Sequence, residues 1–397
     1  MMEISKPFFA KAYPDLDCNV LLHPWNESCV DSIPYTYMHS FIGSAKFYSL
    51  IYAAQIAMRG KKLKNKEEWI KMGQYYARST LLGAVVCGTC CTLGCVLRRM
   101  LGSKFQYHAI FLIPSTINGV CIYLEPPSRR SLVINLFSSL MLEYWLRTAE
   151  RAGYISMTKS KQTLMFMLSS AFLFYLMRLE GDKKERTPLF WLFTPEKVKW
   201  KNDNEKDDSP CPHSGPCLRH IFKGTVAYFG VGTALTLARV ILPKIGSPLR
   251  ALSSIQPKHF RMGLFFGSYI GIYRAVICYL CRKRGADAAL YALPAGYLAG
   301  LSFLFSPSLG FATASVTAAL KLYSTILYEK KVLPSNVPLP ELLYCICQGT
   351  LFHARFLHPE TCPSYMFKLT DGVSNGRTKE LSDNIQAVAR MALSIGL

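Results

Sequence analysis

Long uncharged apolar runs, separated by charged gaps, constrain this chain more than any other feature. The clearest, Ser79–Leu97, contains no charged residue and has the length of a helix that crosses a bilayer. Phe105–Leu124 is of the same kind, and Ala288–Leu320 is long enough for two spans joined by a turn at Ser306–Ser308. Because the runs lack the period-two alternation of barrel strands, they predict helices. We therefore expect an all-α polytopic membrane protein.

Shorter apolar runs raise the expected number of spans to eight, with two further segments that can lie in the interface or re-enter. Lys and Arg number 46 against 25 Asp and Glu, a net charge of +21. Since these charges bracket the runs, we expect contact with a lipid bilayer and its anionic headgroups, and not with nucleic acid. The shorter runs are Phe41–Met58, Ser131–Leu146, Gln162–Met177, Ile221–Ala238, Met262–Cys281, Leu322–Leu327 and Leu342–Ala354.

An internal repeat organises the runs. A shift of 180 residues superimposes four of them, together with the prolines of Pro114–Pro127 on those of Pro294–Pro307. Unrelated hydrophobic runs that happen to align are the alternative. We expect two tandem four-helix repeats, each followed by an extra apolar segment, with parallel and inverted arrangements both open. The expected parts are an N-terminal Cys/His segment at 1–40, a first membrane repeat at 41–180, a charged Cys/His linker at 181–219, a second membrane repeat at 220–357 and a C-terminal tail at 358–397.

Two groups of cysteine and histidine residues lie outside the apolar runs. Thiolate and imidazole groups at these spacings are ligands that zinc uses, and the N-terminal group can complete the shell of the linker group. The same cysteines can instead form one disulfide within each group if they face an oxidising compartment. Zinc is the only cofactor that the sequence suggests. The N-terminal group is Cys18, His23 and Cys29, and the linker group is Cys211, His213, Cys217 and His220.

Arg274 lies inside the apolar stretch that begins at Met262. An arginine at bilayer depth costs at least about 2.5–3.5 kcal/mol, so it normally faces a partner or water. The alternative is that its long side chain reaches the interface. If Arg274 is buried, Glu143 and Glu329 are the expected carboxylate partners.

Glycines at every fourth position open a flat groove on two of the expected helices. Such grooves let helix backbones touch where lipid provides no hydrophobic drive. We expect these residues to pack helices within the chain, or alternatively to meet a second copy in a homo-oligomer. They are Gly263, Gly267, Gly271, Gly296 and Gly300.

The sequence shows little that belongs to an enzyme. It contains no P-loop or HExxH motif and no pair of carboxylates inside the apolar runs. We therefore expect a non-enzymatic protein with no catalytic residues.

Five short motifs are distributed along the chain: Cys18…His23-Pro24-Trp25…Ser28-Cys29, Cys211-Pro212-His213…Cys217…Lys223-Gly224, Gly263…Gly267-Ser268-Tyr269…Ile272-Tyr273-Arg274, Ala295-Gly296-Tyr297-Leu298-Ala299-Gly300-Leu301-Ser302 and Pro363-Ser364-Tyr365. They resemble the transmembrane protein 135 family, and the resemblance extends over essentially the whole chain. It implies a multi-pass protein of peroxisomal and/or mitochondrial membranes, linked to the balance of mitochondrial fission and fusion, to peroxisome organisation and to lipid metabolism. Organelle-division or lipid-handling proteins are the partners it implies.

In the second repeat an aromatic, a basic and an acidic residue precede a glycine helix, namely Tyr273, Arg284, Asp287, Gly296 and Gly300. This pattern is distantly similar to the four-helix family of mitochondrial inner-membrane protein translocase channels, although the spacing around Asp287 departs from it. The similarity implies a shared four-helix fold more than a shared activity.

A transporter or pore for a lipid or small metabolite is the alternative function. A repeat with close-packed glycine helices and a buried arginine often forms a substrate path at the membrane midplane.

Overall fold

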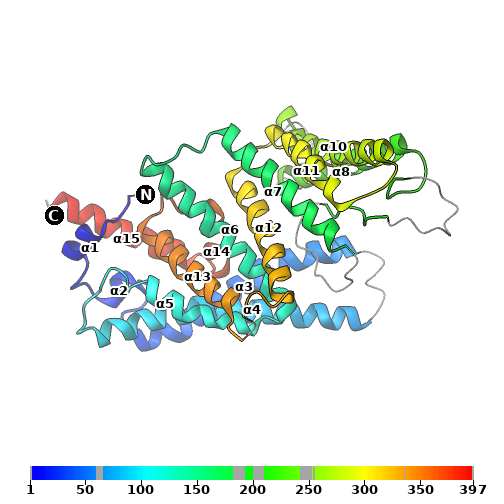
Figure 1. Ribbon diagram of the computed structural model, residues 1–397. Coiled ribbons are helices and arrows are strands. Elements are labelled where there is room, and N and C mark those ends of the chain that lie inside the picture. The colour runs from blue at the N-terminus through cyan, green and yellow to red at the C-terminus, as the bar shows by residue number, and fades with distance from the viewer. Residues whose placement is uncertain are drawn as a thin grey trace. The chain divides into compact units, whose positions relative to one another are not determined.

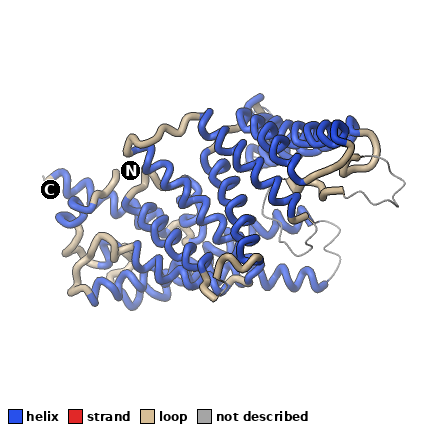
Figure 2. Tube along the Cα trace, in the orientation of Figure 1, coloured by secondary structure: helices blue, strands red, loops and turns tan. Residues whose placement is uncertain are grey.

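A computed structural model describes residues 2–59, 66–181, 193–199, 210–241, 253, 255–334 and 336–395. Throughout these residues the regular structure is helical, with no strand (Figure 2), and the all-α prediction is confirmed. The chain divides into two compact units, residues 1–155 with 337–397, and residues 156–336. The sequence of the linker also suggests a short surface helix around Leu189–Phe193, and almost all of that segment lies outside the described residues.

The first unit is built on a pair of long helices, α3 (Cys29–Arg59) and α4 (Lys66–Met100), which pack side by side (Figure 1). A third helix, α5 (Leu112–Asn118), continues as the 3-10 helix η2 (Gly119–Leu124), and α6 (Pro127–Arg151) follows. The remaining elements are α1 (Lys6–Ala12), α2 (Cys18–Leu21), α13 (Leu339–Leu357), α14 (Ser364–Val373) and α15 (Arg377–Ser394).

The second unit has the same order of elements. Its long pair is α8 (Cys217–Ile241) and α10 (Arg261–Arg284), with η4 (Pro257–Phe260) running into α10. The third helix again changes type, from α11 (Ala292–Ala299) to η6 (Gly300–Phe305), and α12 (Leu309–Glu329) follows. This recurrence is what the sequence repeat predicts, and the duplication itself stays a prediction. The other elements are α7 (Lys159–Leu179) and η5 (Ala289–Tyr291).

The extra helix after each set of four packs with the other set. α7 follows α6 in the chain but packs on α11 and α12, and α13 follows α12 but packs on α5 and α6. The fit depends on glycine: a Cβ on Gly300 would lie 2.6 Å from the Cα of Met167 in α7, and one on Gly119 would lie 2.7 Å from the Cα of Cys345 in α13. The compact units therefore cut across the sequence segments 41–180 and 220–357.

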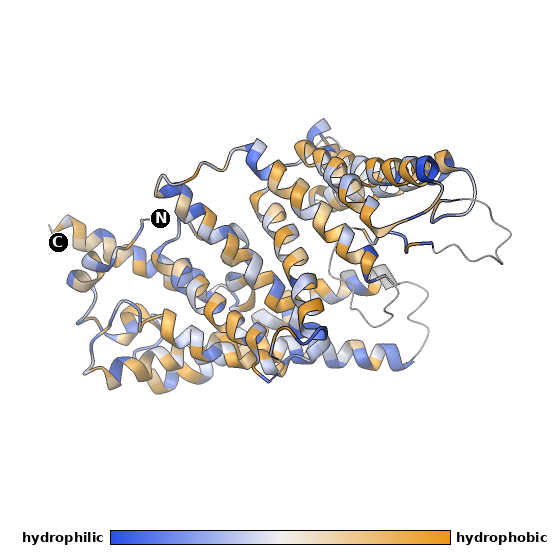
Figure 3. Ribbon diagram, viewed as in Figure 1, coloured by the Kyte–Doolittle hydropathy of each residue, from blue (hydrophilic) through white to orange (hydrophobic). Residues whose placement is uncertain are grey.

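Three helices among the described residues are long and apolar enough to cross a membrane: α4, α7 and the η4–α10 helix. About half of each apolar window is buried inside the protein. Leu81, Leu168 and Leu264 are among the large apolar side chains that these helices leave exposed, and such side chains suit contact with lipid. Hydrophilic residues gather at helix ends and loops (Figure 3). These features support a membrane-embedded protein.

Two runs that were expected to span are shorter as helices. In the run Phe105–Leu124 the α-helix begins only at Leu112. In the run Ala288–Leu320 the first α-helix, α11, begins at Ala292. Pro114 and Pro294 lie in the first turn of their helices, where a missing N–H breaks no hydrogen bond. Each proline therefore marks the start of a short helix inside a longer apolar run.

Candidate metal centres

Three residues at the N-terminus and one in a long helix form a compact cluster in the first unit. Cys18 starts α2, His23 follows in the next turn, Cys29 is the first residue of α3, and Cys95 lies in the last two turns of α4. One ligand atom from each of the four lies within 4.8 Å of all the others. Cys18 and His23 face the same point because the backbone N–H of His23 bonds to the carbonyl of Cys18, 3.1 Å away.

The imidazole of His23 is oriented by the backbone. Its Nδ1 lies 2.8 Å from the carbonyl oxygen of Asn26 and its Nε2 lies 3.3 Å from the Sγ of Cys29. A carbonyl that accepts from Nδ1–H directs Nε2 toward the sulfurs, which is the usual orientation of a histidine whose Nε2 binds a metal once it has lost its proton.

Hydrogen bonding activates the first cysteine of this cluster. A hydrogen bond from Cys95 lowers the pKa of Cys18 to about 4, with smaller contributions from His23 and Arg98, although burial opposes the change. Burial lowers the pKa of His23, but its hydrogen bonds to Cys18, Asn26 and Cys29 outweigh this and raise the pKa to about 9. The lowered pKa of Cys18 favours its thiolate, the form that binds metals.

The second unit holds a cluster of the same composition. It comprises Cys211, His213, Cys217 at the first position of α8, and Cys278 in the last two turns of α10, again with one ligand atom each within 4.8 Å of the others. The Sγ atoms of Cys211 and Cys217 are 3.6 Å apart, and Nε2 of His213 is 3.2 Å from the Sγ of Cys278. Burial raises the pKa of Cys211, so metal coordination is what would deprotonate it.

The geometry of both clusters suits a tetrahedral ion. Bonds of about 2.3 Å to sulfur and about 2.0 Å to nitrogen place two tetrahedral sulfur ligands about 3.8 Å apart, and a sulfur and a nitrogen about 3.5 Å apart. The distances of 3.2, 3.3 and 3.6 Å approach these values. All fourteen cysteines are free, whereas a disulfide requires about 2.05 Å between sulfurs. The clusters can hold a metal ion such as zinc.

The predicted ligand sets need two corrections. Each cluster is completed by a cysteine of a helix in its own unit, Cys95 or Cys278, and not by the other group. His220 is not among the ligands, since its ring stacks on His213 at 4.1 Å while its Nε2 lies 3.3 Å from Glu196. Cys95 and Cys278 lie inside apolar runs, where a cysteine usually behaves as a small hydrophobic residue, so the sequence did not mark them as ligands.

Arg274 reaches the surroundings of the second cluster. Its side chain is 16% exposed and pairs with Glu196 at 2.8 Å, and it also donates to the carbonyl of His220 at 3.0 Å. The expected partners were wrong: Glu143 pairs with Arg147, one turn along α6, at 2.7 Å, and Glu329 is exposed at the end of α12. The actual partner comes from the linker, which the sequence marks only as charged and solvated.

The predicted packing glycines all lie at helix contacts in the second unit. Gly263, Gly267 and Gly271 face Thr233, Phe229 and Thr225 of α8, while Gly296 and Gly300 face Ala171 and Met167 of α7. A second copy of the chain is not needed to explain them.

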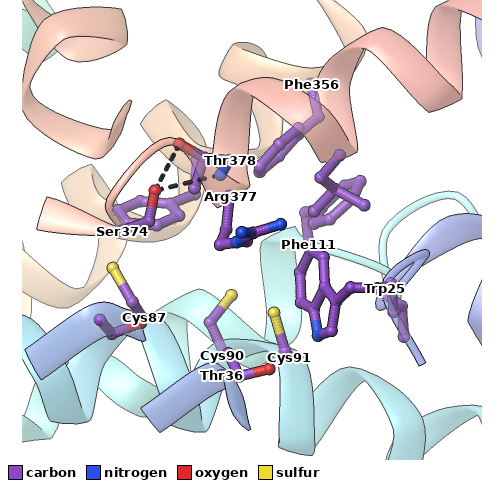
Figure 4. A pocket seen from close by; sticks show the side chains of 14 residues that line it. Trp25, Thr36, Cys87, Cys90, Cys91, Phe111, Phe356, Ser374, Arg377 and Thr378 are labelled. Carbon is purple, nitrogen blue, oxygen red and sulfur yellow. Dashed lines mark hydrogen bonds between the residues drawn. The ribbon is translucent and has the colours of Figure 1, made fainter. Parts of the chain in front are cut away.

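The first unit contains two small cavities, and one of them adjoins the N-terminal cluster. One, of about 90 Å³, is lined by His23, Cys29 and Cys95 among others, and leaves room beside the ligands for an ion. The other, of about 30 Å³, lies between the α4 cysteines Cys90 and Cys91 and the side chain of Arg377 (Figure 4). That volume has room for one or two water molecules, and not for a lipid.

Helices with exposed apolar faces and two Cys/His clusters at helix ends define an all-helical membrane protein with candidate metal centres. Residues 15–149 match the N-terminal cysteine-rich region of Transmembrane protein 135. The matched region contains all four residues of the first cluster, and over residues 15–149 the resemblance to the transmembrane protein 135 family is confirmed. No solved structure matches the chain. The similarity to translocase channels stays a prediction.

Proposed function

We propose that this chain is a non-enzymatic, multi-pass protein of peroxisomal and/or mitochondrial membranes. In this role it regulates the balance of mitochondrial fission and fusion, peroxisome organisation and lipid metabolism. The observation that supports the proposal is the family match over residues 15–149, joined to apolar helices suited to a bilayer.

The Cys/His clusters suggest how such a protein presents surfaces to partners. Each cluster holds the short segment before α3 or α8 against the last turns of a long helix. Segments held in this way offer defined docking surfaces to organelle-division or lipid-handling proteins, because less conformational entropy is lost on binding.

We also propose zinc as the ion for these clusters. Three sulfurs and one imidazole nitrogen in each form a donor set that favours zinc, whereas magnesium and calcium prefer oxygen ligands. Metal analysis of the purified chain tests this assignment.

The location is tested by density-gradient fractionation of cells that express the tagged chain, followed by alkaline carbonate extraction. Carbonate-resistant signal that tracks peroxisomal or mitochondrial markers supports the proposal, and lipid profiling with organelle imaging of a knockout then tests the regulatory role. Signal with the endoplasmic reticulum, with Asn26 glycosylated in the sequon Asn26-Glu27-Ser28, would contradict it.

A transporter or pore for a lipid or small metabolite is the second candidate. One feature favours it: the third helix in each unit changes from α-helix to 3-10 helix partway along, and discontinuous helices often line substrate sites in transporters. Flux of a lipid or small metabolite through liposomes that contain the purified chain, and not through protein-free liposomes, would support this candidate over a regulator.

A further inference from the structure

We infer that the two clusters are one structural site built twice: a zinc clip of three cysteines and one histidine that closes the open end of a helical hairpin in each unit. The inference rests on the proposal that zinc is the bound ion. It adds that each chain binds two ions, at equivalent and independent sites.

The order of ligands along the chain is the same in both units. A cysteine and a histidine come from the segment before the hairpin, the third ligand is the first residue of the hairpin's first helix, and the fourth lies near the end of its second helix. Cys29 therefore corresponds to Cys217, and Cys95 to Cys278. The start of one helix is thereby joined to the end of its neighbour.

The histidines are also presented in the same way. In both clusters Nε2 faces a cysteine sulfur, at 3.3 Å for His23 and 3.2 Å for His213, and Nδ1 faces a backbone carbonyl. Two segments with different ligand spacings reach one arrangement, which argues for a common task and against a chance cluster of thiols.

Four protein ligands indicate a structural ion. Catalytic zinc sites keep one position open for water or substrate, whereas structural sites are closed by four side chains. Each unit supplies all four ligands itself, so neither site depends on the other unit or on a second chain.

The residues that surround the ligands differ between the two units. Around the second cluster, Glu196 lies between His220 and Arg274, and His220 stacks on the ligand His213. Around the first, Arg98 pairs with Asp17 beside the ligand Cys18, at 3.3 Å. The two ions should therefore leave at different rates.

The test is the metal content of the purified full-length chain in detergent, measured by mass spectrometry for elements. We expect two zinc ions per chain, one in Cys95→Ser and in Cys278→Ser, and none in the double variant. Cys91→Ser and Cys281→Ser, which change cysteines of the same helices outside the clusters, should retain two.

A second measurement, on the unaltered chain, tests the proposal if the variants fail to fold. Titration of the unaltered chain with an organomercurial, in the presence of a chromogenic zinc chelator, should release two ions in two phases. A folded chain with one zinc, or with two that survive both Cys95→Ser and Cys278→Ser, would overturn the duplicated clip while leaving zinc binding intact. A folded chain without zinc, whether its cluster thiols are reduced or oxidised, would overturn the zinc proposal itself.

Discussion

Arg178 and Asp287 form an ion pair in which neither side chain is exposed: Nη2 lies 2.5 Å from Oδ2, with side-chain exposures of 1% and 0%. Arg178 also donates to the carbonyls of Glu196 and Ala288, and Asp287 accepts from the backbone N–H of Lys199. The pair thereby joins the end of α7 to the turn after α10 and to residues 193–199.

Removing one member of this pair should destabilise the second unit strongly. Breaking a buried ion pair leaves an uncompensated charge and typically costs about 3–5 kcal/mol. We expect Arg178→Gln and Asp287→Asn each to lower the melting temperature of the detergent-solubilised chain, measured by fluorescence-detected size exclusion after heating.

Lys71→Gln provides the matched control for that measurement. Lys71 pairs with Glu68 on the surface of α4, with 57% and 37% of the side chains exposed, and such pairs contribute about 0–1 kcal/mol. Equal melting temperatures for Arg178→Gln and Lys71→Gln would show that the buried pair does not stabilise the fold.

Arg274→Gln should speed the loss of one zinc ion. Without its guanidinium, Glu196 loses the 2.8 Å ion pair that holds it beside His220, and outer residues of this kind typically change metal affinity 10–100-fold. The expected result is one ion released to a chelator about tenfold faster, with the other unchanged. Lys283→Gln, in the last turn of α10, should match the unaltered chain, and equal release from Arg274→Gln would contradict the prediction.

Gly300→Ala should destabilise the packing of α7. Its Cβ would lie 2.6 Å from the backbone Cα of Met167, so a helix must shift, and forced overpacking typically costs about 1–3 kcal/mol. Gly73→Ala is the counterpart, because nothing lies within 4 Å of its Cβ position in α4, and it should stabilise by roughly 0.5–1 kcal/mol. A thermal shift of the same sign for both variants would be inconsistent with this packing.

The sequence was sufficient for the helical class and for part of each cluster. Uncharged runs predict helices whatever they pack against, and Cys18, His23 and Cys29 are visible as a group because they are close along the chain. The partner of Arg274 was missed for the opposite reason. Glu196 lies in a polar linker, far from α10 in sequence, and only tertiary packing brings the two together.

Comparison of the sequence with itself also does not show that α7 and α13 each pack with the other set of four helices. A shift of 180 residues reveals which segments are alike and contains no information on which of them touch. Packing decides this, through the close approach of Gly119 to Cys345 and of Gly300 to Met167. Cys95 and Cys278 were missed as ligands because burial in a helix is the commoner role of such cysteines.

The packing of α7 and α13 predicts which part of the chain folds alone. Residues 156–336 contain α7, whose Phe166 and Phe174 are fully buried in a core with Phe265 and Phe303. A fragment of residues 181–357 lacks α7 and carries α13 without its partners α5 and α6. Since loss of a single buried phenylalanine side chain costs about 3–5 kcal/mol, we expect only residues 156–336 to elute as a monodisperse species with one zinc ion. A monodisperse, zinc-bound 181–357 fragment would show that each extra helix belongs with the set that precedes it.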